Sequence, residues 1–324
     1  MRSARTIYIL GSGAIGFPLA AHLTRAGRRV LAVRTSRDDV LRSAVMITTY
    51  DRGRPISTPV ETISLSELRQ IDGIIVIASK SYANQAIARA LRDRAALGPI
   101  VIMQNGVGVE QPFLDAQFPT IYRCILYITG QTRAEYTYSA HAVAPSPIGI
   151  ICGDEAELQR CVADLSTADT PFRAEADIQR EIWKKAIINC VFNSICPLLD
   201  TDNGVFARDA AAAALARELI AECVALTARL GIGLDARELS ERIIFLSTQS
   251  AGQLASTLQD IRGGRQTEIA SLNLEIARIA AALQPPLDLP RVALLGKLIA
   301  VISAQQAHVP PPAEAGMPPA RHDD

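Results

Sequence analysis

The chain has 324 residues, which is enough for two domains that each bury a core. Its 49% hydrophobic and 20% charged residues are typical of a globular protein. The 33 basic and 33 acidic side chains cancel, so we expect neither nucleic acid nor a membrane surface as a partner. The sequence shows no signal-peptide-like or membrane-spanning apolar run, and its six cysteines form no CxxC pair. We therefore expect a cytoplasmic protein with reduced thiols.

Short apolar runs alternate with helical stretches in the first half of the chain. Strands are predicted at Thr6–Leu10, Arg29–Arg34, 73–78 and 99–104, with helices at 14–26 and 82–96. Further β-type runs cover 122–129 and Ser146–Cys152, and a short helix is predicted over 155–166. Continuous apolar strands separated by helices indicate a parallel sheet covered on both faces, as in a doubly wound Rossmann domain.

The second half has a different character. From about Asp177 the sequence predicts long helices with few β signals, so we expect a Rossmann domain over 1–176 and an all-helical domain over 177–307. The boundary is placed near Ala176. The remaining residues, 308–324, are rich in proline and alanine and are expected to be disordered.

A GxGxxG motif follows the first predicted strand and opens the first predicted helix. It consists of Gly11, Ser12, Gly13, Ala14, Ile15 and Gly16. In this context the glycines allow a tight turn, close approach of a pyrophosphate and close helix–strand packing. The helix N-terminus then faces the phosphates with free N–H groups. The alternative is an ordinary turn between a strand and a helix.

The second predicted strand ends in Arg34-Thr35-Ser36-Arg37. An NAD-binding domain usually has an acidic residue there, which binds the ribose 2′-hydroxyl and would repel a 2′-phosphate. A guanidinium attracts that phosphate, so Arg34 favours NADP over NAD. A solvated loop arginine is the alternative.

Lys80 and Asn105 each follow a predicted parallel strand directly. Ligands bind at the carboxyl ends of such strands, so both side chains are expected beside the Gly11 loop. Asn105-Gly106 is also compatible with an ordinary turn, and Lys80 with a surface charge.

A polar column is predicted on the first helix of the second half, over 181–199. Lys185, Asn189 and Asn193 are spaced i, i+4 and i+8, so they share one face among apolar neighbours. Buried polar groups must be satisfied or used. In the functional interpretation they line a site. In the structural one the asparagines cap neighbouring helices and the lysine reaches solvent. Lys184 lies off the column and is expected to be a solvated charge.

A second notable segment covers 256–269. Gly263 and Gly264 should end a helix, and Thr267 can begin a new one as its N-cap. Glu268 would then lie in the first turn of the new helix, where a carboxylate is favourable even without a functional role.

These motifs together resemble the ketopantoate reductase (2-dehydropantoate 2-reductase) family. The similarity runs from the first strand to about Ala304 and includes GSGAIG, QNGVG at 104–108, WKKAIIN followed by Asn193 and Asn203-Gly204, and STLQDIRGGRQTEI. The resemblance implies a 6-phosphogluconate-dehydrogenase-like architecture. It also implies NADPH-dependent reduction of 2-dehydropantoate to (R)-pantoate, a step in pantothenate and coenzyme A synthesis.

The resemblance also implies roles for individual residues. Lys185 would be the general acid that protonates the keto oxygen, and Glu268 would bind the substrate hydroxyl. Asn105 would lie near the nicotinamide and the substrate, and Asp260 would order the site. Substrate-pocket positions would be Asn189, Asn193, Asn203 and Ser256, with Ser256 near the carboxylate. Arg34 and Lys80 would contact the 2′-phosphate side of NADPH.

Two features depart from the family pattern: Ser194 stands where proline is common, and 133–144 lacks the usual glycine- and histidine-containing pattern. The departures leave open a paralogous NADPH reductase of another 2-keto acid. A non-catalytic NADPH-binding sensor is a third alternative. No metal is expected, since Lys185 can stabilise the developing alkoxide. The oligomeric state is not fixed by the sequence, and a homodimer stays open.

Overall fold

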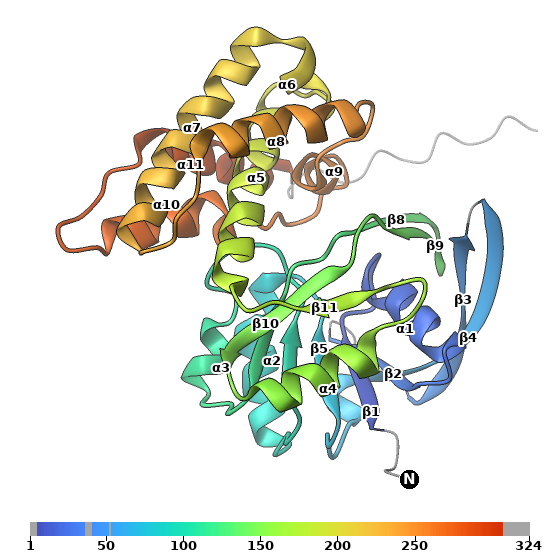
Figure 1. Cartoon of the computed structure of the whole chain (residues 1–324). Helices are drawn as coiled ribbons and strands as arrows, with labels where there is room; N and C mark the ends of the chain where they lie inside the picture. The colour runs from blue at the N-terminus through green and yellow to red at the C-terminus, as the bar shows by residue number, and fades with distance from the viewer. Residues whose placement is uncertain (1–4, 36–40, 52, 307–324) are drawn as a thin grey trace, which may run out of the picture.

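The computed structural model describes residues 5–35, 41–51 and 53–306, which form two parts (Figure 1). The lower part in this view is a sheet flanked by helices, and the upper part consists of helices. The tail predicted to be disordered, 308–324, lies outside the described residues, as do Ser36 and Arg37.

Within the described ranges, one 11-stranded sheet has the order β11-β10-β7-β6-β5-β1-β2-β4-β3-β9-β8. Its strands are β1 (Thr6–Leu10), β2 (Arg29–Arg34), β3 (Ser43–Asp51), β4 (Arg54–Ser64), β5 (Ile74–Ile77), β6 (Ile100–Ile102), β7 (Ile121–Cys124), β8 (Ile128–Ala134), β9 (Thr137–Ala142), β10 (Ser146–Cys152) and β11 (Phe172–Ala174). The central block β4-β2-β1-β5-β6-β7 is parallel throughout. This is the strand order of a doubly wound dinucleotide-binding sheet, so the predicted Rossmann fold is confirmed.

Helices cover both faces of the parallel block. Side chains alternate along β1, so Ile7 and Ile9 pack against α1 and α4, whereas Tyr8 and Leu10 pack on the face that carries α2 and α3. The helical segments of this part are α1 (Gly16–Arg25), η1 (Leu65–Glu67), η2 (Ser81–Ala83), α2 (Asn84–Asp93), α3 (Gln111–Asp115) and α4 (Glu155–Leu165).

Two hairpins extend the sheet beyond what the sequence predicted. Strands β3 and β4 pair antiparallel, and β8 and β9 form a second antiparallel pair at the sheet edge. The predicted β-run at 122–129 is therefore divided between β7 and β8. Residues of β4 and β8 are largely exposed or alternate between exposed and buried. Strand β8 lies at the sheet edge, and β4 pairs antiparallel with β3 on one side, so neither shows the continuous apolar run that marks a central parallel strand.

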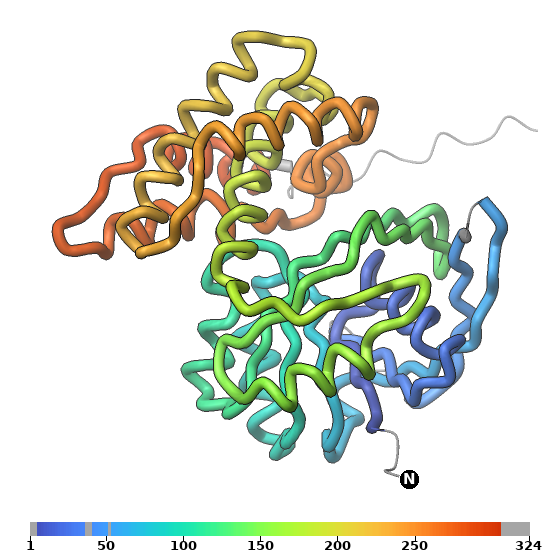
Figure 2. The backbone as a smooth tube through the Cα atoms, viewed as in Figure 1, coloured from blue at the N-terminus to red at the C-terminus, as the bar shows by residue number. Residues whose placement is uncertain are grey.

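The second part is helical, as predicted. Its elements are α5 (Ile178–Leu198), α6 (Val205–Arg208), α7 (Ala210–Arg229), α8 (Ala236–Gln249), α9 (Ser256–Arg262), η3 (Ile269–Ser271), α10 (Asn273–Ala281) and α11 (Pro290–Gln306). Helix α5 rises from the sheet part and packs against α7, α9 and α11 (Figure 2). We retain Ala176, in the segment between β11 and α5, as the proposed domain boundary.

The prediction that a helix begins at Thr267 is wrong. The chain is irregular from the end of α9 to Glu268, a short 3-10 turn follows, and α10 begins only at Asn273. Thr267 is buried and makes no cap. Arg265 donates to Asp260, and Glu268 accepts from Lys80 of the sheet part. These tertiary contacts, rather than the local N-cap pattern, determine the conformation of this segment.

Two expectations from composition also concern the whole chain. All six cysteines carry free thiols, as predicted. Five of them are buried and Cys152 is half-buried. Among the described residues, no helix combines the length and the apolar composition needed to cross a membrane.

The three glycines of the GxGxxG loop have different environments. Gly11 has φ +116°, and a Cβ there would lie 2.3 Å from the Ser79 nitrogen. A Cβ on Gly16 would lie 1.7 Å from the Gly11 carbonyl oxygen, whereas one on Gly13 would meet nothing within 4 Å. Gly11 and Gly16 are therefore required by the turn and by packing, and Gly13 is the position at which the backbone stays open to a ligand.

We expect Gly16→Ala to destabilise the protein by about 1–3 kcal/mol or more, because the new methyl group overlaps the backbone. Gly13→Ala is the matched control and should change the free energy of unfolding by less than about 0.5 kcal/mol. Urea denaturation followed by circular dichroism measures both. Equal stability of the two variants would contradict this account of the loop.

Candidate active site

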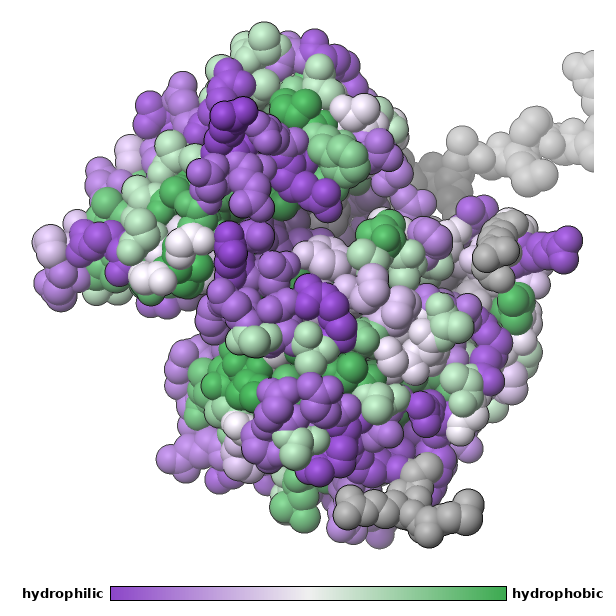
Figure 3. Space-filling view, viewed as in Figure 1, coloured by the Kyte–Doolittle hydropathy of each residue, from purple (hydrophilic) through white to green (hydrophobic). Residues whose placement is uncertain are grey.

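A small pocket lies where the two parts meet. Its walls come from the loop after β6, including Asn105 and Gly106, from Leu126 after β7, and from Ile182 and Lys185 on α5. Figure 3 shows the surface indented between the sheet part and the helical part. The pocket thus lies at the carboxyl ends of parallel strands, where doubly wound sheets bind ligands.

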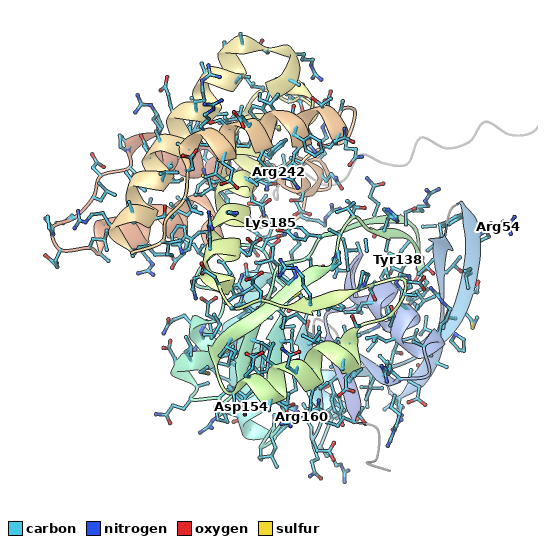
Figure 4. The ribbon with its side chains drawn as sticks, in the orientation of Figure 1. Arg54, Tyr138, Asp154, Arg160, Lys185 and Arg242 are labelled. Carbon is cyan, nitrogen blue, oxygen red and sulfur yellow. The ribbon has the colours of Figure 1, made fainter. Side chains whose placement is uncertain are left out.

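Lys185 reaches this pocket from α5 (Figure 4). Its half-buried ammonium donates to the Leu126 carbonyl over 3.3 Å and lies 5.8 Å from the centre of the Tyr127 ring. Burial lowers the pKa of Lys185, and the positive charge of Arg242 lowers it further. Within the described residues, no carboxylate pairs with Lys185. Its environment therefore favours release of its proton.

Tyr127 shapes the wall beside Lys185. Its hydroxyl donates to Glu181 over 2.9 Å, and burial together with the Glu181 charge raises the pKa of Tyr127 to about 12. The tyrosine therefore stays neutral and presents its ring to the lysine.

Lys184 is partly exposed, as expected of a solvated charge, but it also has carboxylate partners that the sequence did not predict. Its ammonium lies 3.8 Å from Glu181 and 3.4 Å from Glu238 of α8. Contacts from a second helix could not be read from the spacing in α5. The pairing leaves Lys184 bound to carboxylates, unlike Lys185.

The asparagines of the predicted column have separate partners. Asn189 donates to the side-chain oxygen of Asn105 over 3.3 Å, which joins the column to the loop after β6. The Asn193 side-chain oxygen accepts from the Ser256 hydroxyl and from the Thr257 backbone nitrogen, both over 3.0 Å. Asn193 thus caps the start of α9, in agreement with the structural interpretation of that residue.

Asn203 lies in the loop between α5 and α6. Its backbone nitrogen donates to the Gln253 carbonyl over 2.8 Å, in the loop that leads to Ser256. Its side-chain oxygen is buried and has no hydrogen-bond partner among the described residues. A buried acceptor without a partner is available to a ligand donor.

A charged cluster joins the two parts near Lys80. The Lys80 ammonium lies 2.9 Å from Asp260 and 3.1 Å from Glu268, and Glu268 also accepts from the Ser81 backbone nitrogen over 3.2 Å. Burial acts to lower the pKa of Lys80, but the two carboxylates outweigh it and raise the pKa. Glu268 therefore faces the sheet part rather than standing in a first helical turn.

The loop that carries Asn105 is held by an arginine that sequence reasoning missed. Arg123 is fully buried, forms an ion pair with Glu110, and donates to the carbonyls of Gln104 (3.3 Å) and Gly106 (3.0 Å). These two carbonyls flank Asn105. The single charge inside the apolar run around β7 was the available signal, because a buried charge must have partners.

On its other side the same loop meets the helical part. Gly106 has φ +100°, and a Cβ there would lie 2.3 Å from the Ser271 carbonyl oxygen. The Val107 nitrogen donates to that oxygen over 3.0 Å. The glycine therefore permits the close approach of the two parts beside Asn105.

Arg34 lies at the end of β2 in an aromatic setting. It donates to the Tyr136 hydroxyl over 2.8 Å, and its guanidinium lies 5.6 Å from the Tyr136 ring centre and 5.7 Å from that of Phe17. Tyr136 belongs to the turn between β8 and β9, within the segment that departs from the family pattern. The arginine is therefore fixed by rings and is not a solvated loop charge.

The glycine loop and Arg34 fit a dinucleotide. The open space at Gly13 leaves room for a pyrophosphate against the backbone, and the Arg34 Nε is buried without a partner among the described residues. Strand β8 crosses the loop closely, since a Cβ on Gly130 would lie 2.4 Å from the Ala14 carbonyl oxygen. For the described part of the chain, no group of three or more His, Cys, Asp or Glu side chains is suited to a metal ion.

Comparison with known protein families identifies the family to which this chain belongs. The family model for ketopantoate reductase PanE/ApbA matches residues 7–149, and the model for its C-terminal part matches 177–303. The chain belongs to the ketopantoate reductase family. The resemblance noted in the sequence is thereby confirmed.

Curated relatives and solved structures extend the comparison. The chain is 28% identical to the 2-dehydropantoate 2-reductase of Pyrococcus abyssi, over 87% of this chain and 94% of the relative. Identity to that of Archaeoglobus fulgidus is 25%, over 84% and 90%. A D-mandelate dehydrogenase solved with NADH and anilino(oxo)acetate has the same fold, with a TM-score of 0.80, 18% identity and coverage of 93% and 99%. A ketopantoate reductase from Staphylococcus aureus, described as dimeric, has a TM-score of 0.78, 19% identity and coverage of 93% and 99%.

For this member of the ketopantoate reductase family, we expect Arg123→Met to cost about 3–5 kcal/mol of unfolding free energy, because it leaves the Glu110 carboxylate without its cation. Combining it with Glu110→Gln should recover part of that loss, since the stranded charge is removed. Guanidinium denaturation of the parent, both single variants and the double variant gives the coupling. Additive losses would show that the pair does not act as a unit.

Proposed function

We propose that the protein is an NADPH-dependent 2-dehydropantoate 2-reductase, which forms (R)-pantoate for pantothenate and coenzyme A synthesis. Family membership and the names of the curated relatives support the reaction class. The observation that carries the proposal is the Lys185 ammonium, half-buried beside Asn105 without a carboxylate partner among the described residues.

The cofactor-binding residues in this proposal are the backbone of the Gly11–Gly16 loop, Arg34 and Asn105. The loop N–H groups would bind the pyrophosphate, and Arg34 would bind the 2′-phosphate of NADPH. In this proposal Lys80 also contacts the 2′-phosphate side of NADPH. In the structure its ammonium pairs with Asp260 and Glu268. When bound, the nicotinamide supplies the hydride that adds to the keto carbon.

Lys185 acts as the general acid. As negative charge develops on the keto oxygen, the Lys185 ammonium stabilises it and transfers a proton, leaving a neutral amine that solvent reprotonates. Asn189 and Asn105, which bond to each other, orient the substrate beside it. Glu268 would accept from the substrate hydroxyl, and Asn193, Asn203 and Ser256 would line the pocket farther along α5.

Two alternatives remain distinct from this proposal. A reductase of another 2-keto acid would use the same residues, and a structurally similar protein is named D-mandelate dehydrogenase. A sensor would bind the cofactor without turnover. NADPH oxidation with a panel of keto acids separates them: turnover of 2-dehydropantoate supports the proposal, another preferred keto acid supports a paralogue, and no turnover supports a sensor. A homodimer is proposed as well, and sedimentation tests it.

Lys185→Ala should lower kcat by about 10²–10⁴, the usual contribution of general acid catalysis, with little change in NADPH affinity. Lys184→Ala is the matched control and should be mild, because Lys184 is bound to carboxylates. Steady-state kinetics and cofactor fluorescence titration measure these effects. Near-normal turnover by folded Lys185→Ala would rule out this donor.

The same assignment fixes the pH dependence of keto-acid reduction. The active form is protonated, so kcat should fall as pH rises through the pKa of Lys185. Burial and Arg242 lower that pKa, so the fall should begin below the ordinary lysine value of about 10.4. A kcat profile over alkaline pH shows the limb in the parent and its loss in Lys185→Ala. An unchanged limb in the variant would assign it to another group.

Arg34→Asp should shift the preference from NADPH toward NADH by about tenfold or more, because a charge-assisted phosphate contact is replaced by repulsion. Arg29→Asp, an exposed arginine at the opposite end of β2, is the control. The ratio of kcat/KM for the two cofactors is the measurement. Equal use of NADPH and NADH by the unmodified protein would end the proposal for Arg34.

A further inference from the structure

Glu181 and Lys185 stand four residues apart on α5, yet no salt bridge joins them in the described part of the chain. Side chains with this spacing are neighbours on a helix surface, and a glutamate one turn before a lysine is the favourable order for an ion pair. The Lys185 ammonium instead donates to the Leu126 carbonyl over 3.3 Å. Another contact therefore holds the Glu181 carboxylate.

That contact is made by Tyr127. Its hydroxyl donates to Glu181 Oε2 over 2.9 Å. Glu181 Oε1 lies 3.8 Å from the ammonium of Lys184. Both carboxylate oxygens thus have partners, and neither partner is Lys185.

Tyr127 is itself held in place through its backbone. Its N–H donates to the hydroxyl of the fully buried Ser146 over 2.9 Å, and its carbonyl accepts from the Val143 nitrogen over 2.8 Å. The centre of its ring lies 5.8 Å from the Lys185 Nζ, within the range of a cation–π interaction. Lys185 therefore faces a neutral ring in place of a carboxylate.

We propose that Tyr127 is a positioning residue for the proton donor, because by binding Glu181 it keeps the Lys185 ammonium free of a carboxylate. The inference rests on the proposed reductase function and deepens it. An ammonium paired with a carboxylate has fewer N–H groups for the keto oxygen and holds its proton more tightly, so it is a poorer general acid. A neutral hydroxyl as the partner of Glu181 prevents this pairing without adding a charge beside Lys185.

The other titratable groups around Lys185 either have partners or keep one charge state. They are Lys184 on α5, Glu238 and Arg242 on α8, and Arg123 and Cys124 in β7. Lys184 pairs with Glu238, the arginines keep their charge, and the Cys124 thiol stays neutral because burial raises its pKa. A shift in the titration of Lys185 after a change at Tyr127 therefore reports on Glu181.

Tyr127→Phe keeps the ring and removes the hydroxyl, so Glu181 becomes free to pair with Lys185. Because an opposite charge favours the protonated form, the alkaline fall in kcat should move to higher pH by about one pH unit. At neutral pH kcat should drop by about tenfold, since the ammonium is then bound to the carboxylate. Adding Glu181→Gln to Tyr127→Phe should return the fall to its parental position, because the carboxylate is gone.

The same titration can be followed without turnover. The chain contains four lysines, which are Lys80, Lys184, Lys185 and Lys297. Lysine labelled with carbon-13 at Cε gives one NMR signal for each, and Lys185→Arg identifies the signal of Lys185. In the full-length protein this signal should titrate at higher pH in Tyr127→Phe than in the parent, and at the parental pH in the double variant.

Tyr8→Phe is the matched control, because the Tyr8 hydroxyl also donates to a carboxylate, that of Asp72, over 3.2 Å, and Tyr8 does not line the pocket. It should leave the Lys185 titration unchanged. Thermal unfolding confirms that each variant is folded. If Tyr127→Phe does not fold, the comparison of Tyr127→Leu with and without Glu181→Gln decides, since a lower midpoint in the double variant is expected there as well.

A folded Tyr127→Phe whose Lys185 signal titrates as in the parent overturns the inference, and so does a shift that persists after Glu181→Gln is added. Absence of turnover of any 2-keto acid by the parent, with either nicotinamide cofactor, would instead overturn the proposed function. The NMR titration decides on the contact between Tyr127 and Glu181 in either case.

Discussion

The two parts of the molecule are held in register by one ammonium group between two carboxylates. Asp260 and Glu268 of the helical part are largely buried, and burying a carboxylate is costly unless a cation pairs with it. Lys80 at the end of β5 supplies it. The same contact brings Ser81 to Glu268 and Ser271, beside the loop that carries Asn105. The charge cluster therefore supports the pocket below α5 together with the Val107–Ser271 backbone hydrogen bond and the Asn189–Asn105 contact.

Lys185 has the opposite surroundings, and this difference separates the roles of the two lysines. Two carboxylates outweigh the effect of burial and raise the pKa of Lys80, whereas burial and the positive charge of Arg242 lower the pKa of Lys185. A structural cation must keep its proton, and a general acid must be able to lose it. In the proposed mechanism the protein thus uses one residue type for two tasks, because different charges lie near the two lysines.

The sequence predicted those features that depend on neighbours along the chain. The bounds of β1, β2 and β10 and the helical face shared by Lys185 and Asn189 follow from local periodicity. Pairings between Lys80 and Glu268, or Lys184 and Glu238, join residues far apart in the chain, so spacing within one helix could not reveal them. The helix start expected at Thr267 failed for the same reason, because tertiary contacts decided that segment.

The segment that departs from the family pattern lies at the edge of the sheet and supplies a contact to Arg34. The turn between β8 and β9 supplies Tyr136, which contacts Arg34 at the proposed cofactor edge. The central strands cannot change in this way, because their side chains pack against helices on both faces. The hairpin is more exposed, but Tyr136 and Tyr138 pack against the core beside Phe17, so substitutions at these two positions would alter both the surroundings of Arg34 and the packing of Phe17. In the proposed function, the surroundings of the cofactor's 2′-phosphate therefore depend on this hairpin, whereas the position of Lys185 depends on a helix anchored in the second core.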